Sequence, residues 1–159
     1  MTRRALAMLM LIASIAVASG CRGPSTIADQ AKSAFRQARE WRSDARLAQV
    51  MVGPGASNTR TVTFYFRSAS SDRDGYVITN GQGVPAQIGG GQLFDPPFID
   101  YSEAVADAKK ANLLKDDPGS GSLSMETVNG KAVLTWNLTG VRVDANTGEV
   151  LTTLSPGYE

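Results

Sequence analysis

Residues 141–154 read VRVDANTGEVLTTL, and this stretch decides the fold class that the chain is expected to adopt. Two short apolar runs flank a turn in which Asp144 can accept hydrogen bonds from backbone amides and Gly148 can take a positive φ. The pattern predicts antiparallel strands over residues 141–143 and 149–154. We interpret Asp144 and Glu149 as turn and strand-edge residues before any ligand is invoked.

The residues before this hairpin predict a helix and two further strands. Asp100 and Glu103 resemble a helix capping box, and apolar residues then recur at helical spacing as far as Leu114. Asn129-Gly130 is the strongest signal for a two-residue hairpin turn, with alternating residues on both sides. We therefore expect residues 98–154 to form an α+β unit with a helix packed on an antiparallel sheet, its middle strands covering residues 122–128 and 131–139.

The first half of the chain repeats this order of elements. An apolar stripe at three- and four-residue steps predicts a helix that begins after Ser25 or Thr26 and continues to Ala45. Strands are predicted over residues 47–52, 60–67, 75–79 and 84–88, with a turn at residues 80–83. An offset of 65 residues superimposes Gly75 on Gly140 and Gly83 on Gly148. We expect two tandem units, residues 27–90 and 98–154, divided by the Gly- and Pro-rich residues 89–97.

The second of these units resembles a known family. SEAVADAKKA at residues 102–111, a two-stranded segment with Trp136, and VRVDANTGEV at residues 141–150 resemble the PepSY domains of bacterial envelope proteins. These domains are known from propeptides of some secreted metallopeptidases and from many lipoproteins. The resemblance implies a helix across an antiparallel sheet and a role in binding or restraining peptidases, with no catalytic residues to transfer. Residues 26–88 would be a diverged copy, with Thr79 and Val84 in place of Asp144 and Glu149.

The N-terminus carries the pattern of an exported lipoprotein. Arg3 and Arg4 precede an apolar run over residues 5–17, and Cys21, the single cysteine of the chain, follows Ala-Ser-Gly. This resembles the bacterial lipobox, although Ala18 stands where Leu is favoured. We expect residues 1–20 to be a signal peptide, Cys21 to be lipidated, and residues 21–26 to be a tether. The alternative is a secreted protein with a free thiol.

This anchor predicts where the protein resides. Lipidation of Cys21 would hold the chain in the cell envelope, on the periplasmic face of the outer membrane if the source is Gram-negative. No nucleic-acid partner is expected. The charge is unevenly distributed, at +4 over residues 22–75 and −5 over residues 76–159, which predicts either a dipolar surface or two halves that attract each other.

The residue inventory excludes several classes of catalytic site. The chain has no histidine and no thiol other than Cys21, which removes histidine-based triads, cysteine nucleophiles and the usual zinc ligands. Paired carboxylates, either Asp116 with Asp117 or Asp144 with Glu149, are the remaining acid and base candidates, and solvated turn charges are the simpler interpretation. A calcium-like run begins at Ser70, but Gly81 stands where the loop needs a bidentate glutamate. We expect no enzyme, no metal and no cofactor.

Two sets of residues are candidates for contacts with partners. A basic face on the first predicted helix is either a polyanion or anionic-lipid contact, or a solvated face interleaved with Glu40 and Asp44. Tyr65 and Trp136 are either core residues or the rim of a peptide-binding edge. The basic candidates are Lys32, Arg36, Arg39, Arg42 and Arg46.

Two functions follow from these candidates. The first is a lipid-anchored, non-enzymatic module that binds a protein or peptide of the envelope and restrains a peptidase. The second is a structural or surface lipoprotein whose basic first helix contacts lipid or another polyanion.

Overall fold

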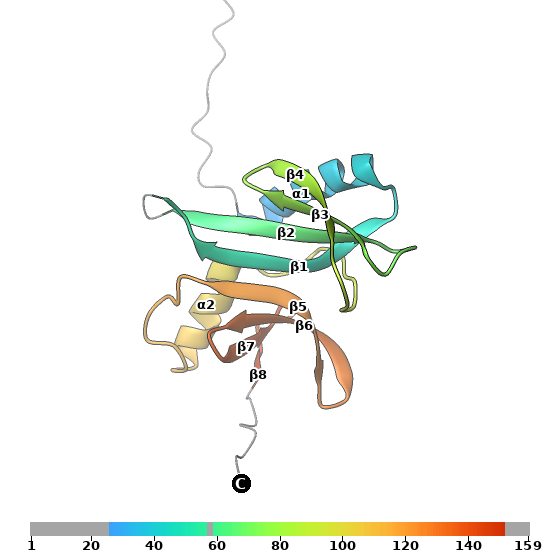
Figure 1. Cartoon of the computed structure of the whole chain (residues 1–159). Coiled ribbons are helices and arrows are strands. Elements are labelled where there is room, and N and C mark those ends of the chain that lie inside the picture. The colour runs from blue at the N-terminus through green and yellow to red at the C-terminus, as the bar shows by residue number, and fades with distance from the viewer. Residues whose placement is uncertain (1–25, 57–58, 152–159) are drawn as a thin grey trace, which may run out of the picture.

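The computed structural model describes residues 26–56 and 59–151, which fold as two helices on one antiparallel sheet (Figure 1). The strand order is β4-β3-β2-β1-β5-β6-β7-β8, and every neighbouring pair is antiparallel. This is the α+β class that the sequence predicts. The elements are α1 (Ile27–Trp41), β1 (Ala45–Pro54), β2 (Arg60–Ser68), β3 (Asp74–Thr79), β4 (Gln82–Gln87), α2 (Tyr101–Lys110), β5 (Gly121–Val128), β6 (Lys131–Leu138), β7 (Val141–Asp144) and β8 (Val150–Leu151).

Each half of the chain contributes one helix and then four strands that follow one another in the sheet. The halves meet where β1 pairs with β5, through Val50 and Leu123, Met51 and Ser122, and Val52 and Gly121. Figure 1 shows the first half above this junction and the second half below it. The expected tandem order of elements is therefore present, but the strands form one continuous sheet.

The first helix ends earlier than the apolar stripe predicts. Thr26 caps α1 by accepting a hydrogen bond from the N–H of Asp29 at 3.1 Å. Arg42 already has an extended backbone, with φ −147° and ψ 126°, so α1 ends at Trp41. Ala45 continues the stripe in sequence, but it lies at the start of β1 and is buried there. The prediction was wrong here because a buried alanine suits a helix and a strand equally.

The second helix has the predicted start and an earlier end. The Asp100 side chain accepts a hydrogen bond from the N–H of Ser102, and it also accepts one from the N–H of Ile27, at 2.7 Å. Asp100 therefore joins the first residues of both helices. Asn112 takes a left-handed conformation with φ 60°, and the N–H of Leu113 bonds back to the Ala108 carbonyl. This ends α2 at Lys110, so Leu114 lies beyond the helix.

Three hairpins close with two residues at positive φ, as the right-handed twist of a β-hairpin favours. They are Asn80-Gly81, Asn129-Gly130 and Thr139-Gly140. Gly83, which the 65-residue offset equates with Gly148, lies within β4 instead. Gly148 has the expected positive φ, at 75°, and Asp144 accepts the N–H of Asn146 at 2.7 Å. The turn interpretation of Asp144 is confirmed; residues 152–154 of the last predicted strand lie outside the described residues.

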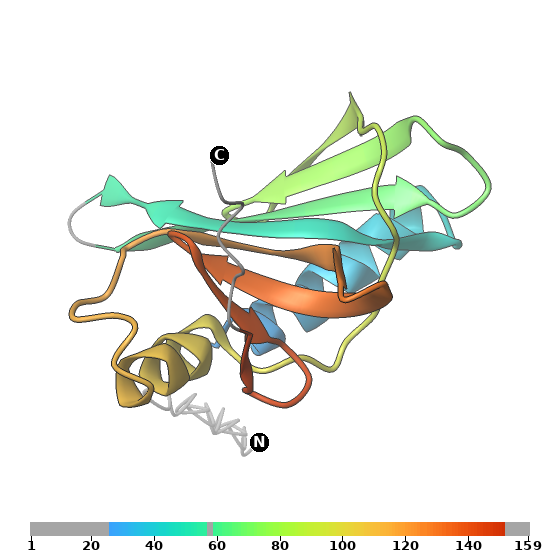
Figure 2. The same cartoon turned by 90° about the horizontal axis from the view of Figure 1, so that it is seen from below.

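The segment between β4 and α2 has no helix or strand, as predicted, yet it is packed against the body. Arg67 donates hydrogen bonds to the carbonyls of Gly90 and Gly91, at 2.6 and 2.9 Å. Phe94 forms an isolated antiparallel bridge with Leu47 of β1. Figure 2 shows this yellow segment running across the molecule from the first half to α2. We call residues 88–99 the connector.

One hydrophobic core extends through both halves. Phe35 of α1 meets Phe66 of β2 edge to face, with ring centroids 5.0 Å apart. In the second half, Trp136 is fully buried and meets Tyr101 at 5.6 Å. Phe98 of the connector lies 6.5 Å from Trp136, and all these rings belong to a single cluster of buried residues. The connector therefore completes the core and does not act as a free linker.

Candidate functional site

The two sides of the sheet differ in how they are covered. Val50, Phe64, Ile78, Leu123 and Trp136 lie in register across five strands, and all are buried in the core that both helices share. Their neighbours along each strand point to the opposite side, because side chains alternate along a strand. We call this second side the open face; it presents Gln49, Met51, Thr63, Tyr65, Val77, Thr79, Ser122 and Asn137.

The open face mixes apolar and hydroxyl side chains. Met51 lies on β1, in the middle of the sheet, and is 43% exposed. Thr63 and Thr79 share a hydrogen bond between their hydroxyls at 3.0 Å, and Tyr65 is half-buried on the same strand as Thr63. Val84, on the edge strand β4, is 57% exposed. Such a surface can contact a protein through apolar patches and through hydroxyl and amide groups.

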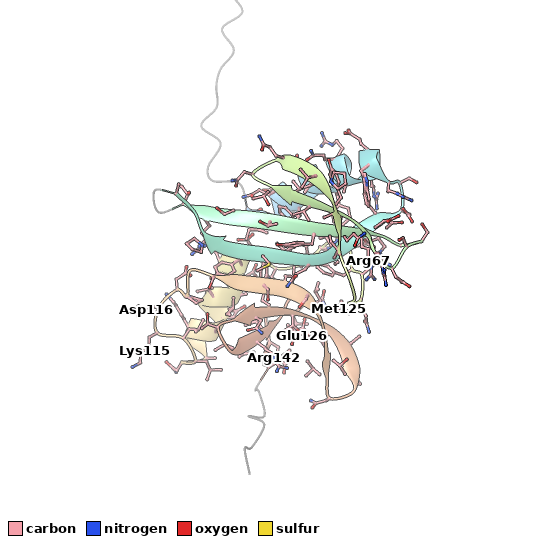
Figure 3. The ribbon with its side chains drawn as sticks, in the orientation of Figure 1. Arg67, Lys115, Asp116, Met125, Glu126 and Arg142 are labelled. Atoms are coloured by element: carbon pink, nitrogen blue, oxygen red, sulfur yellow. The ribbon has the colours of Figure 1, made fainter. Side chains whose placement is uncertain are left out.

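Charged side chains border the open face at two places. Arg142 of β7 lies 3.5 Å from Glu126 of β5, and Figure 3 labels both residues in the second half. Arg46 of β1 pairs with Asp95 of the connector at 2.9 Å. Each of these two cations has a carboxylate partner, whereas Arg67, which lies in register with Arg46, donates to the carbonyls of Gly90 and Gly91.

Tyr65 and Trp136, the two predicted contact aromatics, have different environments. Trp136 is fully buried, and its indole N–H donates to the carbonyl of Ile99 at 2.9 Å. Its interpretation as a partner contact is wrong, because packing and this hydrogen bond use the whole side chain. Tyr65 lies on the open face of β2, two strands inside the edge strand β4. Neither aromatic residue lines a sheet edge that a peptide could extend.

The five predicted basic residues do not share one helical face. Lys32, Arg36 and Arg39 are exposed on α1, whereas Arg42 follows its last turn and Arg46 belongs to β1. Three of the cations are paired with carboxylates: Lys32 with Asp29, Arg42 with Asp74 and Arg46 with Asp95. Among the described residues, no ion pair engages Arg36 or Arg39, and Arg39 lies over the Phe35 ring. The uncompensated basic surface is therefore much smaller than predicted.

The carboxylates considered as acid and base candidates make structural contacts or face solvent. Figure 3 shows Asp116 beside Lys115 in the loop between α2 and β5. Asp117 bonds to Arg60 and Tyr101, and Asp144 bonds within its own turn. Within the described ranges, no three or more carboxylates and cysteines gather in a way that could hold a metal ion.

Asp44, which sequence reasoning had assigned only to the solvated helix face, organises the turn after β2. Its carboxylate accepts hydrogen bonds from the Ser70 and Ser68 hydroxyls, at 2.7 and 2.8 Å, and from the Ser70 N–H. These hydrogen bonds, those from Ser70 first, lower the pKa of Asp44 to about 2. The network fixes a turn and offers no activated nucleophile.

A second network joins the two halves. Arg60, at the start of β2, pairs with Asp117 and lies over the Tyr101 ring at 4.7 Å. The Tyr101 hydroxyl donates to Asp117 and to the Ser120 carbonyl, each at 3.2 Å. Burial, and secondly the Asp117 carboxylate, raise the pKa of Tyr101 to about 12. Here a cation of the first half meets an anion of the second, as the expectation of attracting halves requires.

Comparisons with known proteins identify a structural relative. No family model matches the chain, and no curated protein matches it. A crystal structure of a candidate lipoprotein from Clostridium difficile 630 has a similar fold, with a TM-score of 0.54 and 13% sequence identity. The similarity covers 77% of this chain and 90% of that one. At this identity the likeness shows a shared fold.

The described helices also bear on how the chain could meet a membrane. Neither α1 nor α2 is long and apolar enough to cross one.

Proposed function

We propose that the protein is a lipid-anchored, non-enzymatic module of the bacterial envelope that binds a protein or peptide through the open face of its sheet. The observation that carries this proposal is the open face itself, where Met51 is 43% exposed at the middle of an eight-stranded sheet. Contiguous exposed apolar patches rimmed by polar residues are typical of interaction surfaces.

The anchor rests on the sequence and on the structural relative. Cys21 follows Ala-Ser-Gly after an apolar run, as in lipoproteins. The similarity covers 90% of the structural relative, and that protein is itself a candidate lipoprotein. Lipid chains on Cys21 would place the helix side, where α1 begins at Ile27, within a few residues of the bilayer. Both helices begin near that point, because Asp100 contacts the Ile27 N–H.

The finer proposal is a pair of PepSY-like units that restrain an envelope peptidase. The repeated order of helix and four strands supports two units, and the two helix starts meet at Asp100. A single sheet built from both units is twice as wide as either unit alone. A restrained peptidase would then cover strands of both halves, with Met51 of β1 near the centre of the contact.

Membrane partitioning tests the anchor. Cells producing the wild-type chain or Cys21→Ser are extracted with a detergent that separates into two phases. We expect the wild type in the detergent phase and the variant in the aqueous phase, because two or more acyl chains are needed for stable anchoring. A Cys21→Ser variant that stays in the detergent phase would contradict the proposed lipid anchor and would leave the binding proposal unaffected.

Inhibition of secreted peptidases tests the binding role. Envelope peptidase activity is titrated with residues 21–159 carrying Cys21→Ser, with and without Met51→Arg. We expect inhibition that Met51→Arg weakens by about tenfold, because a charge buried in an interface loses its solvation. Leu113→Arg, at a 50%-exposed position beyond α2, is the matched control and should leave inhibition unchanged. Equal effects of both variants would refute the open face as the binding surface.

A further inference from the structure

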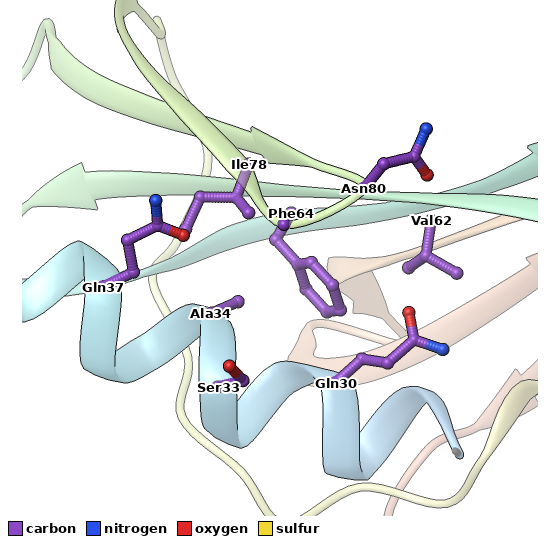
Figure 4. Close-up of a pocket in the computed structure, with 9 residues that line it drawn as sticks. Gln30, Ser33, Ala34, Gln37, Val62, Phe64, Ile78 and Asn80 are labelled. Atoms are coloured by element: carbon purple, nitrogen blue, oxygen red, sulfur yellow. The ribbon is translucent and has the colours of Figure 1, made fainter. Parts of the chain in front are cut away.

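A groove lies on the helix side of the sheet, away from the open face. Two adjoining hollows of about 220 and 510 Å³ share Gln30 and Val62 as lining residues. The smaller hollow lies between α1 and the end of the β3–β4 hairpin (Figure 4). The larger one continues toward the start of α2, where Thr59 and Ser102 line it. We call the two hollows together the amide groove.

The floor of the smaller hollow is apolar and its rim is neutral. Figure 4 shows Phe64, Val62 and Ile78 from the strands facing α1, and Ala34 from the helix below them. Gln30, Ser33 and Gln37 line the wall on α1, at helical spacing, and Asn80 stands on the opposite wall. Carboxamides can donate and accept hydrogen bonds at the same site. Among the described residues, none of those that line this hollow is charged.

In the part of the chain that the structure describes, two charged residues line the larger hollow, and both already have partners. Arg60 pairs with Asp117 and lies over Tyr101. Asp100 accepts the Ile27 N–H at 2.7 Å and the Ser102 hydroxyl at 2.8 Å. A charged ligand would therefore lose solvation without gaining a free counter-ion. These partners favour a neutral ligand along the whole groove.

We propose that the amide groove binds a neutral peptide segment in an extended conformation, with one apolar side chain over Phe64 and Ile78. The two walls supply donors and acceptors for peptide N–H and C=O groups, and the apolar floor takes the side chain. The combined space falls within the size range of small-ligand pockets. The two hollows adjoin at Gln30 and Val62, so one peptide segment can reach both. This site is independent of the open face.

Nuclear magnetic resonance tests this proposal on residues 21–159 carrying Cys21→Ser. The probe is the blocked peptide acetyl-Ser-Gly-Leu-Gly-Ser-amide, with the same peptide carrying glutamate in place of leucine as control. We expect the leucine peptide to shift the side-chain amide resonances of Gln30, Gln37 and Asn80 in a saturable way. The glutamate peptide should bind about tenfold more weakly or not at all, because burying its carboxylate is costly.

Isosteric variants locate the site. The double variant Gln37→Glu with Asn80→Asp keeps side-chain shape and adds two charges to the rim. We expect it to lose about tenfold or more in peptide affinity, whereas Gln49→Glu, the same change on the open face, keeps wild-type affinity. Absence of saturable shifts, equal losses in both variants, or tighter binding of N-acetylglucosamine at the same resonances would overturn the proposal.

Discussion

The two halves of the molecule share an order of elements but fill their cores differently. In the first half, the 15-residue α1 packs against β1, β2 and β3, and its Phe35 meets Phe66. In the second half, α2 has only ten residues, and Trp136 from β6 supplies the bulk, with Tyr101 and the connector residue Phe98 around it. In both halves the helix and the strands each contribute large side chains to the core, and the second half also takes Phe98 from the connector.

Replacing Trp136 should produce the largest effect. We expect Trp136→Ala to lower the free energy of unfolding by about 3–5 kcal/mol, because it empties a fully buried site. It also leaves the Ile99 carbonyl without its indole donor. Phe35→Ala, in the first half, should cost about 3 kcal/mol. Urea unfolding followed by circular dichroism measures both.

The same experiment tests whether the halves are independent. Because one core joins them, each variant should unfold in a single transition at a lower urea concentration. A Trp136→Ala protein that keeps the first half folded while the second unfolds would contradict the shared core.

The contact between the halves should weaken at high pH. The folded pKa of Tyr101, about 12, lies above the unfolded value of 10.0, so the folded state holds its proton longer. The contribution of Tyr101 is fully present below pH 10 and is lost as the pH rises from 10 to 12. Stability measured over this range should fall in the wild type and fall less steeply in Tyr101→Phe.

At neutral pH the Tyr101→Phe variant should lose about 1 kcal/mol, the value of a hydrogen bond to Asp117 or Ser120. Equal falls in stability with rising pH in both proteins would show that burial and Asp117 do not raise the pKa of the Tyr101 hydroxyl.

The first half contains a group that acts at the opposite end of the pH scale. The folded pKa of Asp44 is about 2, below its ordinary value of 3.8, because the Ser70 hydroxyl, the Ser68 hydroxyl and the Ser70 N–H stabilise its carboxylate. Its contribution is present above about pH 4 and is lost as the pH falls toward 2. Asp44→Asn should flatten the acid limb of the stability curve, and an unchanged limb would contradict the network.

The smallest expected effect concerns α1. Only Arg36 and Arg39, of the five predicted basic residues, lack an ion pair among the described residues. We expect Arg36→Gln with Arg39→Gln to change the affinity for anionic vesicles by less than about threefold at physiological salt. A salt-dependent loss of tenfold or more would restore the polyanion hypothesis; Lys109→Gln with Lys110→Gln on α2 is the matched control.

Local signals predicted local structure well. Asn129-Gly130 and the cap at Asp100 depend on neighbouring residues, and the structure has both as predicted. The end of α1 was missed, because buried Ala45 suits a helix as well as a strand, and its pairing with Ser68, which is distant in the sequence, places it in β1. The hydrogen bond of the Trp136 indole had no local signal for the same reason, because its acceptor, the Ile99 carbonyl, is 37 residues distant. Side chains alternate along β2, so Tyr65 and Phe64 face opposite sides of the sheet.

The candidate site was only partly visible in the sequence. Tyr65 was named, but Met51 was not, because a methionine in an apolar strand is usually taken for a core residue. Its exposure follows from its place between the buried residues Val50 and Val52, because side chains alternate along β1. The alternating pattern of β1 alone could have placed Met51 opposite Val50.

Site-specific photo-crosslinking in intact cells tests the central claim most directly. A photoreactive residue is placed at Met51 or Tyr65 on the open face, at Ser33 on the rim of the amide groove, or at Leu113 beyond α2. The proposal predicts one common crosslinked partner from positions 51 and 65 that is absent at position 113 and diminished by Val84→Arg. Equal labelling at all positions, or a specific partner at position 113 alone, would contradict the open face as the binding surface.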